Sequence, residues 1–463
     1  MTENIVKPER PGGFSDFLPS DYLAREKMLK TIEKVFRSFG FDPIETPQIE
    51  FLKTLAGETS ATGKNIFHIK SGKDDEPLAM PFDHTVPFAR ILAANPYNAK
   101  KRTGIRLPWR RMVVGPVFRS DTPQSGRYRQ FYQFDADIAG TSSMMADAEI
   151  VAIMFLAMEA LGVKRFKIRL NNRKILNGLA ALVGITDRRE ARADDITKEM
   201  MRILDKLDKI GLDKVLAELQ ANPETTSHAA PALSDDAIIK IRAFLGLQGS
   251  NEEKLTRCQN VFKGVSVAEE GIGELEQIME YIAGMGIPSE AVEIDFSIAR
   301  GLDYYTGPVM ETILPDAPEF GSVFSGGRYN NLVARFTGKE LPATGASIGV
   351  DRLFAALSHL GAVDRSEQTV TEVMILRIAK DHDPDYLQMA GELREIGLNV
   401  EVCLIEDTTF KSQFNFAISR GMRFAIICGE DEFEKQTVQV KNLETRKQEE
   451  IQRDALADYF KSQ

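Results

Sequence analysis

The stretch FRSDTPQSGRYRQFYQFDAD, residues 118–137, predicts a β-hairpin with a cationic tip. Apolar residues lead up to Phe118, and the second half of the stretch reads as a strand, so two strands flank a turn that contains Pro and Gly. Arg119 comes just before this turn, and Arg127 and Arg129 come just after it. Three arginines are therefore predicted around one hairpin tip, in a chain whose net charge is −10.

The returning strand of this hairpin has two different faces, because neighbouring side chains of a strand point to opposite sides. One face carries Tyr128, Gln130, Tyr132, Phe134, Ala136 and Ile138, and the other carries Arg129, Phe131, Gln133, Asp135 and Asp137. The second, polar face indicates either the solvent side of a sheet or the floor of a polar pocket. Arg119, which leads into the same turn from the partner strand, favours the pocket.

The hairpin lies at the end of a cationic segment in which only Asp121 opposes nine basic residues. These are Lys100, Lys101, Arg102, Arg106, Arg110, Arg111, Arg119, Arg127 and Arg129. Such a run is usually a solvated surface, but Trp109 and the apolar strand 112–118 interrupt this one. A cationic cluster that enters a strand is partly fixed in place, and it suits the phosphates of a nucleotide or a nucleic acid.

The composition is that of an ordinary globular chain, with 463 residues, 43% of them apolar and 27% charged. This length suggests about two to four domains. No apolar run approaches the roughly 20 residues that span a bilayer, and the N-terminus lacks the apolar core of a secretory signal. The three cysteines show no paired spacing, which favours a reducing cytoplasm, and the scattered histidines predict no metal site.

Periodicity along the chain predicts an antiparallel sheet flanked by helices, interrupted by a helical segment and followed by a small α/β domain. The first part, 1–170, contains a predicted helix at 21–39, a strand–loop–helix around residues 83–85, and the hairpin. Residues 171–290 are mostly helical in pattern and form either a separate domain or an insertion, because similar strands lie on both sides. Strands resume over 291–365. After the polar segment 362–370, strands and helices alternate over 371–463.

The common nucleotide-binding signatures are incomplete in this sequence. GETSATGKN, residues 57–65, has one residue too many for a P-loop and carries Asn65 where Ser or Thr should bind magnesium. No G-x-G-x-x-G follows a strand. If the protein uses ATP, it does so on an antiparallel sheet.

Three other stretches contain residues suited to binding small molecules. SIARGLDYYTGPVMET, residues 297–312, combines an arginine, a carboxylate and two tyrosines, which can recognise a small polar side chain or form the rim of a strand. FSGGRYNNL, residues 324–332, has two glycines that allow the backbone to approach a ligand. GASIGVDRL, residues 345–353, opens a helix with glycines and an arginine, which suits either an anion site or a glycine packing contact.

Together these stretches resemble the histidyl-tRNA synthetase family of class II aminoacyl-tRNA ligases, over essentially the whole chain. Helix 21–39 with GFDPIETP resembles motif 1, the hairpin resembles motif 2, and GASIGVDRLFAAL resembles motif 3. These three motifs specify only the class, whereas ARGLDYYTG and SGGRYNNL are specific to histidine. The resemblance implies a class II catalytic domain in two parts, 1–170 and 291–365, a helical insertion at 171–290, and an anticodon-binding domain at 371–463.

The resemblance also implies site residues. Arg119 and Arg300 would be catalytic, and Arg119, Gly349 and Arg352 would bind ATP. The expected histidine-binding residues are Asp83, Thr85, Gln133, Asp137, Arg300, Tyr304, Tyr305 and Tyr329. The expected tRNA-binding residues are Arg127, Arg129, Lys411 and Gln413. The sequence departs from the common family pattern at His84, between two of these residues, at Asn330, where Asp is common, and at Asp137, where other bacterial members carry Glu.

The implied activity is ATP-dependent ligation of L-histidine to its cognate tRNA through a histidyl-adenylate, with AMP and diphosphate released and Mg²⁺ required. The implied protein is a cytoplasmic homodimer. One alternative is a non-catalytic, histidine-sensing regulatory paralogue, but such relatives generally lose the arginines and the C-terminal domain that are present here. Another is a different class II ligase, such as a prolyl or threonyl enzyme, which RGLDYYTG argues against. Recognition of the tRNA 5′ end and the contacts of the insertion stay open.

Overall fold

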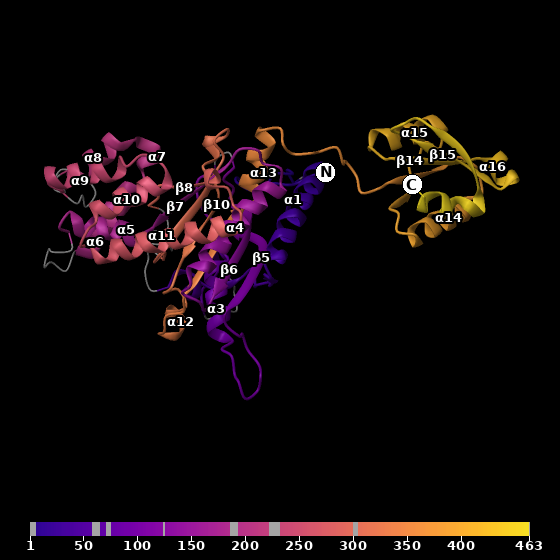
Figure 1. Cartoon of the computed structure of the whole chain (residues 1–463). Coiled ribbons are helices and arrows are strands. Elements are labelled where there is room, and N and C mark those ends of the chain that lie inside the picture. Colours follow the sequence, from indigo (N-terminus) through magenta and orange to yellow (C-terminus); the bar gives the residue numbers. More distant parts are fainter. Residues whose placement is uncertain are drawn as a thin grey trace. The chain divides into compact units, whose positions relative to one another are not determined.

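The computed structural model describes residues 6–57, 65–70, 76–123, 126–185, 193–221, 232–299 and 304–462. The chain forms two compact units, shown in Figure 1. The larger unit comprises residues 29–362 with the N-terminal segment up to Ser15, and the smaller one comprises 363–463 with residues 16–28. Each unit is built on its own β-sheet.

The larger unit is built on an eight-stranded sheet of order β1-β5-β6-β11-β10-β9-β7-β8. Its strands are β1 (Asp42–Pro43), β5 (Trp109–Phe118), β6 (Gln130–Ala139), β7 (Lys167–Asn172), β8 (Val292–Ile294), β9 (Pro308–Ile313), β10 (Ser322–Arg328) and β11 (Ala343–Gly349). Every pair from β5 to β7 is antiparallel, and only the outermost strands β1 and β8 pair in parallel. The predicted antiparallel sheet is thereby confirmed.

The predicted hairpin is the pair β5–β6, whose register runs from Trp109 opposite Ala139 to Phe118 opposite Gln130. The apolar face of β6 packs on helix α1 (Pro19–Ser38). There the ring of Phe36 lies 4.9 Å from that of Phe134, in an edge-to-face arrangement. The polar face of β6 is thus the side turned away from this helix.

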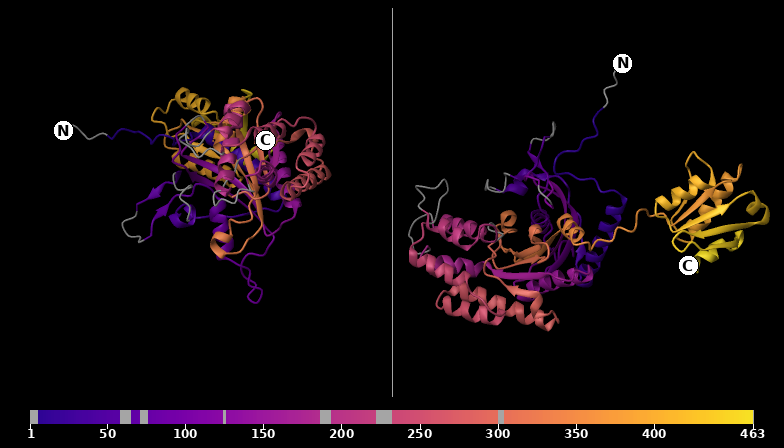
Figure 2. Two further views of the ribbon diagram at one scale, coloured as in Figure 1. Left: turned by 90° about the vertical axis from the view of Figure 1, so that its left-hand side faces the viewer. Right: turned by 90° about the horizontal axis from the view of Figure 1, so that it is seen from above.

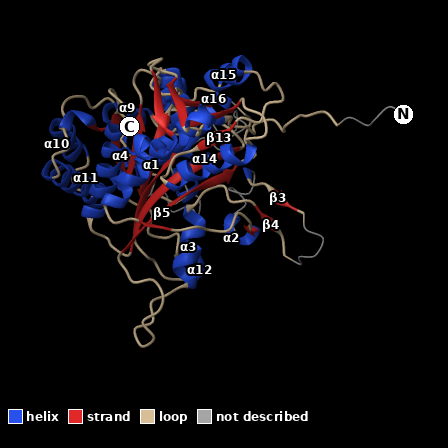
Figure 3. Ribbon diagram, turned by 90° about the vertical axis from the view of Figure 1, so that its right-hand side faces the viewer, coloured by secondary structure: helices blue, strands red, loops and turns tan. Residues whose placement is uncertain are grey.

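Further helices and a small sheet complete the larger unit around the central sheet. The helices are α2 (Leu52–Ala56), α3 (Thr85–Ala94), α4 (Met144–Ala160), α12 (Ala334–Thr337) and α13 (Val350–His359). The small sheet consists of β2 (Glu50–Phe51), β4 (Leu78–Ala79) and β3 (His68–Ile69), and Figure 3 shows β3 and β4 near α2. Helix α4 is joined to the end of β10 by a buried ion pair between Asp147 and Arg328.

The helical segment connects β7 to its parallel neighbour β8 at one end of the sheet. It contains α5 (Arg173–Leu182), α6 (Ala193–Leu204), α7 (Leu207–Ile210), α8 (Leu212–Gln220), α9 (Asp235–Leu245), α10 (Asn251–Val261) and α11 (Ser266–Gly284). These helices gather beside the β7–β8 end in Figures 1 and 2 and belong to the same compact unit as the sheet. The limits 171–290 of an insertion stay a prediction.

Asn251, the first residue of α10, covers the free edge of β8. Its amide nitrogen donates to the carbonyl of Val292 at 2.8 Å, and its amide oxygen accepts from the N–H of Ile294 at 2.8 Å. The side chain thereby makes the two hydrogen bonds that a neighbouring strand would otherwise make.

The smaller unit has a five-stranded sheet of order β13-β12-β14-β15-β16. The strands are β12 (Val373–Arg377), β13 (Val400–Val402), β14 (Phe424–Cys428), β15 (Thr437–Asn442) and β16 (Gln448–Gln452), and the helices are α14 (Asp383–Glu395), α15 (Phe410–Ser419), α16 (Glu430–Lys435) and α17 (Leu456–Lys461). Alternate residues of β12 enter two different cores, Val373 and Ile375 in one, Met374 and Leu376 in the other. Both faces of this sheet are therefore covered, as the predicted alternation of strands and helices requires.

The structure also tests two expectations from composition. All three cysteines are buried and unpaired. Across the described ranges, no helix combines the length and apolar character needed to cross a bilayer.

Candidate active site

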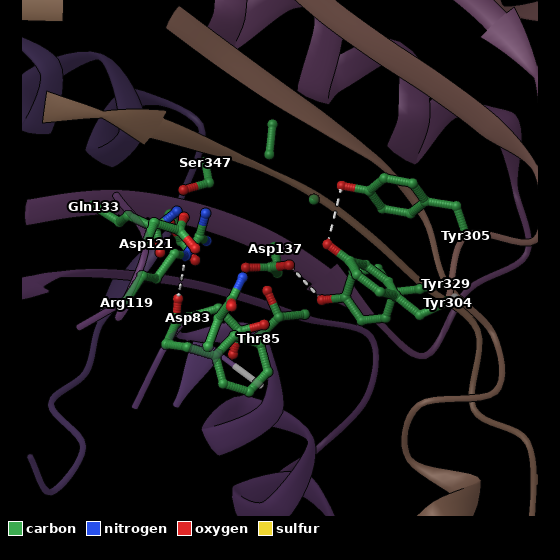
Figure 4. A pocket seen from close by; sticks show the side chains of 15 residues that line it. Asp83, Thr85, Arg119, Asp121, Gln133, Asp137, Tyr304, Tyr305, Tyr329 and Ser347 are labelled. Atoms are coloured by element: carbon green, nitrogen blue, oxygen red, sulfur yellow. Dashed lines mark hydrogen bonds between the residues drawn. The ribbon is translucent and has the colours of Figure 1, made fainter. Parts of the chain in front are cut away.

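A pocket of about 340 Å³ lies on the polar face of β6. We call it the carboxylate pocket. It is lined by Asn65, Phe82, Asp83, Thr85, Arg119, Asp121, Gln133, Asp135, Asp137, Tyr304, Tyr305, Tyr329, Gly345, Ala346 and Ser347. Figure 4 shows Asp137 between the tyrosines on one side and Arg119 with Gln133 on the other. The polar face of β6 is thus a pocket floor, since Asp135 and Asp137 are only 2% and 3% exposed.

Asp137 is held by groups from three different strands or strand ends. The guanidinium of Arg111, directly opposite on β5, forms an ion pair with its Oδ2 at 2.7 Å. The hydroxyl of Tyr329, which follows β10, donates to its Oδ1. On the other side Asp137 is paired with Gly345 of β11, where an added Cβ would lie 2.0 Å from Oδ1. Only glycine at this position leaves room for the carboxylate.

Burial dominates the ionisation of the pocket carboxyls. It raises the pKa of Asp137 to about 6, and Arg111 partly opposes this rise by favouring the charged form. Burial likewise raises the pKa of Asp83 and of Asp135. A ligand that brings positive charge or N–H donors should bind most favourably to a pocket with three buried carboxyls, because it supplies the partners that these groups need.

The tyrosines form one wall of the pocket. The rings of Tyr304 and Tyr305 lie 4.5 Å apart, and their hydroxyl groups are 3.4 Å apart. The ring of Tyr329 meets that of Tyr304 at 6.2 Å, nearly edge-on. Burial is the main cause that raises the pKa of Tyr305 and Tyr329 well above their ordinary value, so both stay protonated. A flat, polar ring of modest size fits such a wall.

His84 has a structural role beside the pocket. Its side chain is 1% exposed, and its Nε2 donates to the carbonyl of Gly115 at 3.1 Å. Burial lowers the pKa of His84 to about 4, so the ring is neutral. The neighbouring Asp83 accepts from the N–H of Val86 at 3.2 Å and thereby caps the first turn of α3. His84, the departure from the family pattern, thus links the residue before α3 to β5 through Gly115.

A second pocket of about 320 Å³ adjoins the first. We call it the arginine pocket. The two share Arg119, Asp121, Gln133, Tyr304, Tyr305 and Ser347, so they are two parts of one cleft. The arginine pocket adds Gly126, Arg127, Tyr128, Phe131, Ser322, Val323, Ser325, Gly349 and Arg352. Within it, three arginines converge from the hairpin and from α13.

Backbone carbonyls orient two of these arginines. The Nε of Arg119 donates to the carbonyl of Phe82 at 3.0 Å, and its guanidinium lies 5.2 Å from the centre of the Phe131 ring. The Nη1 of Arg352 donates to the carbonyl of Ser322 at 2.9 Å. These bonds to backbone oxygens fix the direction in which each guanidinium group faces the cleft.

Most predicted site residues are brought together by the fold. Seven of the eight expected histidine-binding residues line the carboxylate pocket: Asp83, Thr85, Gln133, Asp137, Tyr304, Tyr305 and Tyr329. Arg119, Gly349 and Arg352, expected at ATP, and Arg127, expected at tRNA, line the arginine pocket. Arg300 lies outside the described residues, and its roles stay a prediction.

The remaining expected tRNA residues lie elsewhere. Arg129 lines neither pocket, and its Nε donates to the carbonyl of Asp121 at 3.1 Å. Lys411 and Gln413 lie on α15 of the smaller unit. Lys411 is exposed, whereas Gln413 is 1% exposed and bonds backbone groups of Arg377. The geometry thus favours Lys411 over Gln413 as a residue that touches RNA.

Two features of the sequence prediction need correction. The cationic segment is no single phosphate surface, because Arg111 is buried against Asp137 and Arg110 pairs with Glu149 at 2.6 Å. The glycines of FSGGRYNNL make room for protein groups. A Cβ at Gly326 would lie 2.2 Å from the carbonyl of Gly345 on β11, and one at Gly327 would lie 2.8 Å from the carbonyl of Pro308.

Sequence reasoning missed Arg111, Asp135 and Ser347 as site residues. Asp135 could have been found from the alternation of β6, because it lies between Gln133 and Asp137 on the same face. Arg111 and Ser347 are recognised only once the register is known, because they lie opposite Asp137 and Asp135 on neighbouring strands.

The antiparallel sheet, the hairpin with Arg119 and the strand-to-helix turn before Arg352 define the catalytic domain of a class II aminoacyl-tRNA synthetase. The family model of histidyl-tRNA synthetase matches residues 13–353, and that of the anticodon-binding domain matches 372–463. The chain belongs to the histidyl-tRNA synthetase family.

Individual relatives match over nearly their whole length. The histidine–tRNA ligase of Rhodopirellula baltica is 38% identical over 96% of both chains, and that of Clostridium tetani is 36% identical over 97% of both. The crystal structure of histidyl-tRNA synthetase from Nostoc sp. PCC 7120 superposes with a TM-score of 0.82 at 32% identity, over 99% of this chain and 100% of that one. The similarity therefore includes the C-terminal domain as well as the catalytic sheet.

Proposed function

We propose that this protein ligates L-histidine to its cognate tRNA in two steps, through a histidyl-adenylate. In the first step a carboxylate oxygen of histidine attacks the α-phosphorus of ATP and releases diphosphate. In the second a terminal hydroxyl of the tRNA attacks the activated carbonyl and releases AMP. The observation that carries this proposal is the junction at Arg119 of a pocket suited to histidine and a pocket suited to triphosphate.

Histidine would occupy the carboxylate pocket. Its α-ammonium group suits Asp83 and Thr85 at the start of α3, and its imidazole suits Gln133, Asp137 and the tyrosine wall. An analogue without ring N–H groups would leave buried acceptors unpaired, which discriminates by about 10⁴ or more in sites of this kind. Selection would therefore need no editing step.

ATP would occupy the arginine pocket. Arg119 lies where the α-phosphate must meet the histidine carboxylate, and Arg352 suits the γ-phosphate end, near Gly349. Arg300 is proposed as a second cation at the α-phosphate. No protein nucleophile is needed, because the substrate carboxylate attacks directly and positioned cations stabilise the charge that develops.

Mg²⁺ would enter as part of the ATP substrate. Within the described ranges, no group of three or more His, Cys, Asp or Glu residues could hold a metal ion. Asp121 nevertheless lines the arginine pocket and offers one carboxylate. Mg²⁺ usually binds nucleotide phosphates with several waters and one or two carboxylates, so this donor set fits. The ion would neutralise part of the charge of the phosphates.

The active form is proposed to be a cytoplasmic homodimer that forms through residues 39–47. This segment contains β1, an edge strand that pairs with β5 and includes Pro43, which lacks an N–H. Sedimentation at micromolar concentration should give twice the mass of one chain. An active monomer would contradict this part of the proposal.

Exchange of diphosphate into ATP, measured with each amino acid in turn, tests the main proposal. We expect exchange with histidine alone. Binding of histidine without exchange would favour the regulatory alternative, and exchange with proline or threonine would favour another class II ligase.

Removal of residues 371–463 tests the role proposed for the smaller unit. Histidine-dependent exchange should largely remain, because both pockets lie in the larger unit. Transfer to tRNA should weaken by about 10² or more, since the anticodon contacts would be lost. Equal loss of both activities would contradict this division of roles.

A further inference from the structure

Among the residues that the structure describes, Arg111 is the largest side chain that is completely buried, at 0% exposure. It lies on β5 directly opposite Asp137, so the two side chains share a face of the sheet, and it is not among the residues that line the carboxylate pocket. A guanidinium is costly to bury unless specific partners hold it. Its partners therefore indicate what this buried charge does.

The contacts of Arg111 converge on the site. Its Nη2 forms the 2.7 Å ion pair with Asp137 and donates to the carbonyl of His84 at 3.2 Å. Its guanidinium carbon lies 4.4 Å from the centre of the Phe88 ring on α3. Nε and Nη1 have no hydrogen-bond partner among the residues that the structure describes. The ion pair and the hydrogen bond of this buried cation thus both go to residues of the pocket region, Asp137 and His84.

The arrangement around Asp137 explains why a cation is needed there. Its carboxylate lies over Gly345, accepts from Tyr329 and is only two residues from the second buried carboxyl, Asp135. Without a cation, burial beside Asp135 would favour the protonated form. A protonated carboxyl would offer a hydroxyl where the imidazole N–H needs an acceptor.

We infer that Arg111 is a positioning residue for histidine selection, which fixes Asp137 from the neighbouring strand as a carboxylate acceptor for the substrate ring. The inference rests on the proposed function. Arg111 acts through Asp137 and does not touch the substrate itself.

The test compares the KM for histidine and kcat of Arg111→Gln with those of the wild-type enzyme, by diphosphate exchange from pH 6 to 8.5. We expect KM to rise about 10- to 100-fold, as for loss of a charged hydrogen-bonded partner, while kcat at saturating histidine changes less. Loss of the cation raises the pKa of Asp137, so the ratio of mutant to wild-type KM should be largest at low pH and should fall as pH rises. Titration of free histidine changes both KM values by the same factor, so it cancels in this ratio.

The charged and titratable groups that face Asp137 are Arg111 from β5, Asp135 from β6, His84 before α3, Tyr305 before β9 and Tyr329 after β10. His84, with its pKa lowered to about 4, and the tyrosines keep their protonation states between pH 6 and 8.5. A pH-dependent KM ratio in this range therefore reports the two carboxyls. Asp135→Asn in the Arg111→Gln background separates them, because the dependence should persist when only Asp137 can titrate.

Arg110→Gln is the matched control. It removes the same charge one residue away, on the opposite face of β5, where Arg110 pairs with Glu149 of α4. Its KM for histidine should equal that of the wild type at every pH. Arg111→Lys keeps the charge but cannot place one ammonium at both Asp137 and the His84 carbonyl, so its KM should rise by about 3- to 10-fold.

The outcomes separate the hypotheses. A wild-type KM for Arg111→Gln at every pH would overturn the inference, as would equal losses in kcat and kcat/KM without pH dependence. If Arg111→Gln does not fold, Arg111→Lys decides: an unchanged KM overturns the inference, and a raised KM with preserved kcat supports it. Absence of histidine-dependent exchange in the wild-type enzyme would instead refute the proposed function.

Discussion

The two pockets of the cleft share residues but are built in opposite ways. In the carboxylate pocket Asp137 is buried and is held by the side chains of Arg111 and Tyr329. In the arginine pocket Arg127 is exposed, and Arg352 is half-buried and bonded to a backbone carbonyl. Under the proposed function, the carboxylate pocket selects a small ring through acceptors fixed in position, and the arginine pocket attracts a triphosphate chiefly through positive charge.

Arg119 should give the largest effect of any side chain described, because it places a cation where the two pockets meet. Arg119→Ala should lower kcat for histidine-dependent exchange by roughly 10²–10³, as expected for loss of one preorganised cation. Lys101→Ala, which removes an exposed cation of the same segment, should leave exchange unchanged. Similar losses in the two variants would show that net charge matters more than position.

Substitution of Gly345 should impair the carboxylate pocket and leave the arginine pocket largely unchanged. In Gly345→Ala the new Cβ would meet Oδ1 of Asp137 at 2.0 Å, so the carboxylate must move from its position. We expect KM for histidine to rise about 10- to 100-fold and KM for ATP to change less than about threefold. Steady-state exchange with each substrate varied in turn measures both constants. Equal changes in the two constants would mean that the pockets are not independently built.

Acidification should weaken histidine binding through Asp137. Its pKa is raised to about 6, so below this pH the carboxylate is protonated and KM should rise by up to about tenfold per pH unit. In Asp137→Asn the side chain at position 137 cannot titrate, so the pH dependence of KM that remains is due to the substrate ring. If wild type and variant follow the same pH profile, Asp137 does not control binding.

The effect of Asp137 on folding stability depends on pH in the opposite direction from its effect on histidine binding. Its pKa in the folded protein lies above its ordinary value of 3.8. The contribution is therefore fully present below pH 3.8 and is lost as pH rises through about 6. Weaker binding at pH 5 is thus not an effect of this residue on folding, and a thermal melt at each pH checks the point.

The smallest effect is expected at Gly273, in the middle of α11. A Cβ there would have no heavy atom within 4 Å, so Gly273→Ala is sterically allowed. It should increase the free energy of unfolding by about 0.5–1 kcal/mol through helix propensity, with both KM values unchanged. Chemical denaturation measures the gain. A loss of stability would indicate a packing role for this glycine.

The hairpin and its polar face could be predicted because they depend on local alternation along one strand. Gln133 and Asp137 share a face by parity alone, and the cations at the tip follow from their place beside the turn. The family motifs supplied Asp83 and Thr85, which lie far from the hairpin in sequence. Composition and spacing gave no reason to place them in the same pocket.

Arg111 shows what the sequence did not reveal. Counted along the chain it belongs to a run of cations, and only its register opposite Asp137 identifies it as a buried partner. Gly326 and Gly327 were misinterpreted for the same reason, since the carbonyl groups that they accommodate lie on neighbouring strands. Local patterns thus predict faces and turns, whereas contacts between strands depend on pairings that no single segment encodes.

The amide of Asn251 on the edge of β8 has a consequence for the order in which the chain is made. Residue 251 leaves the ribosome before residues 292–294, which it covers. β7, the partner on the other side, is also made earlier. β8 therefore emerges when both of its neighbours, β7 and Asn251, have already been synthesised, and it can pair with them at once. A nascent chain that folds in this order presents no unpaired β8 edge to the neighbouring chains of a polysome.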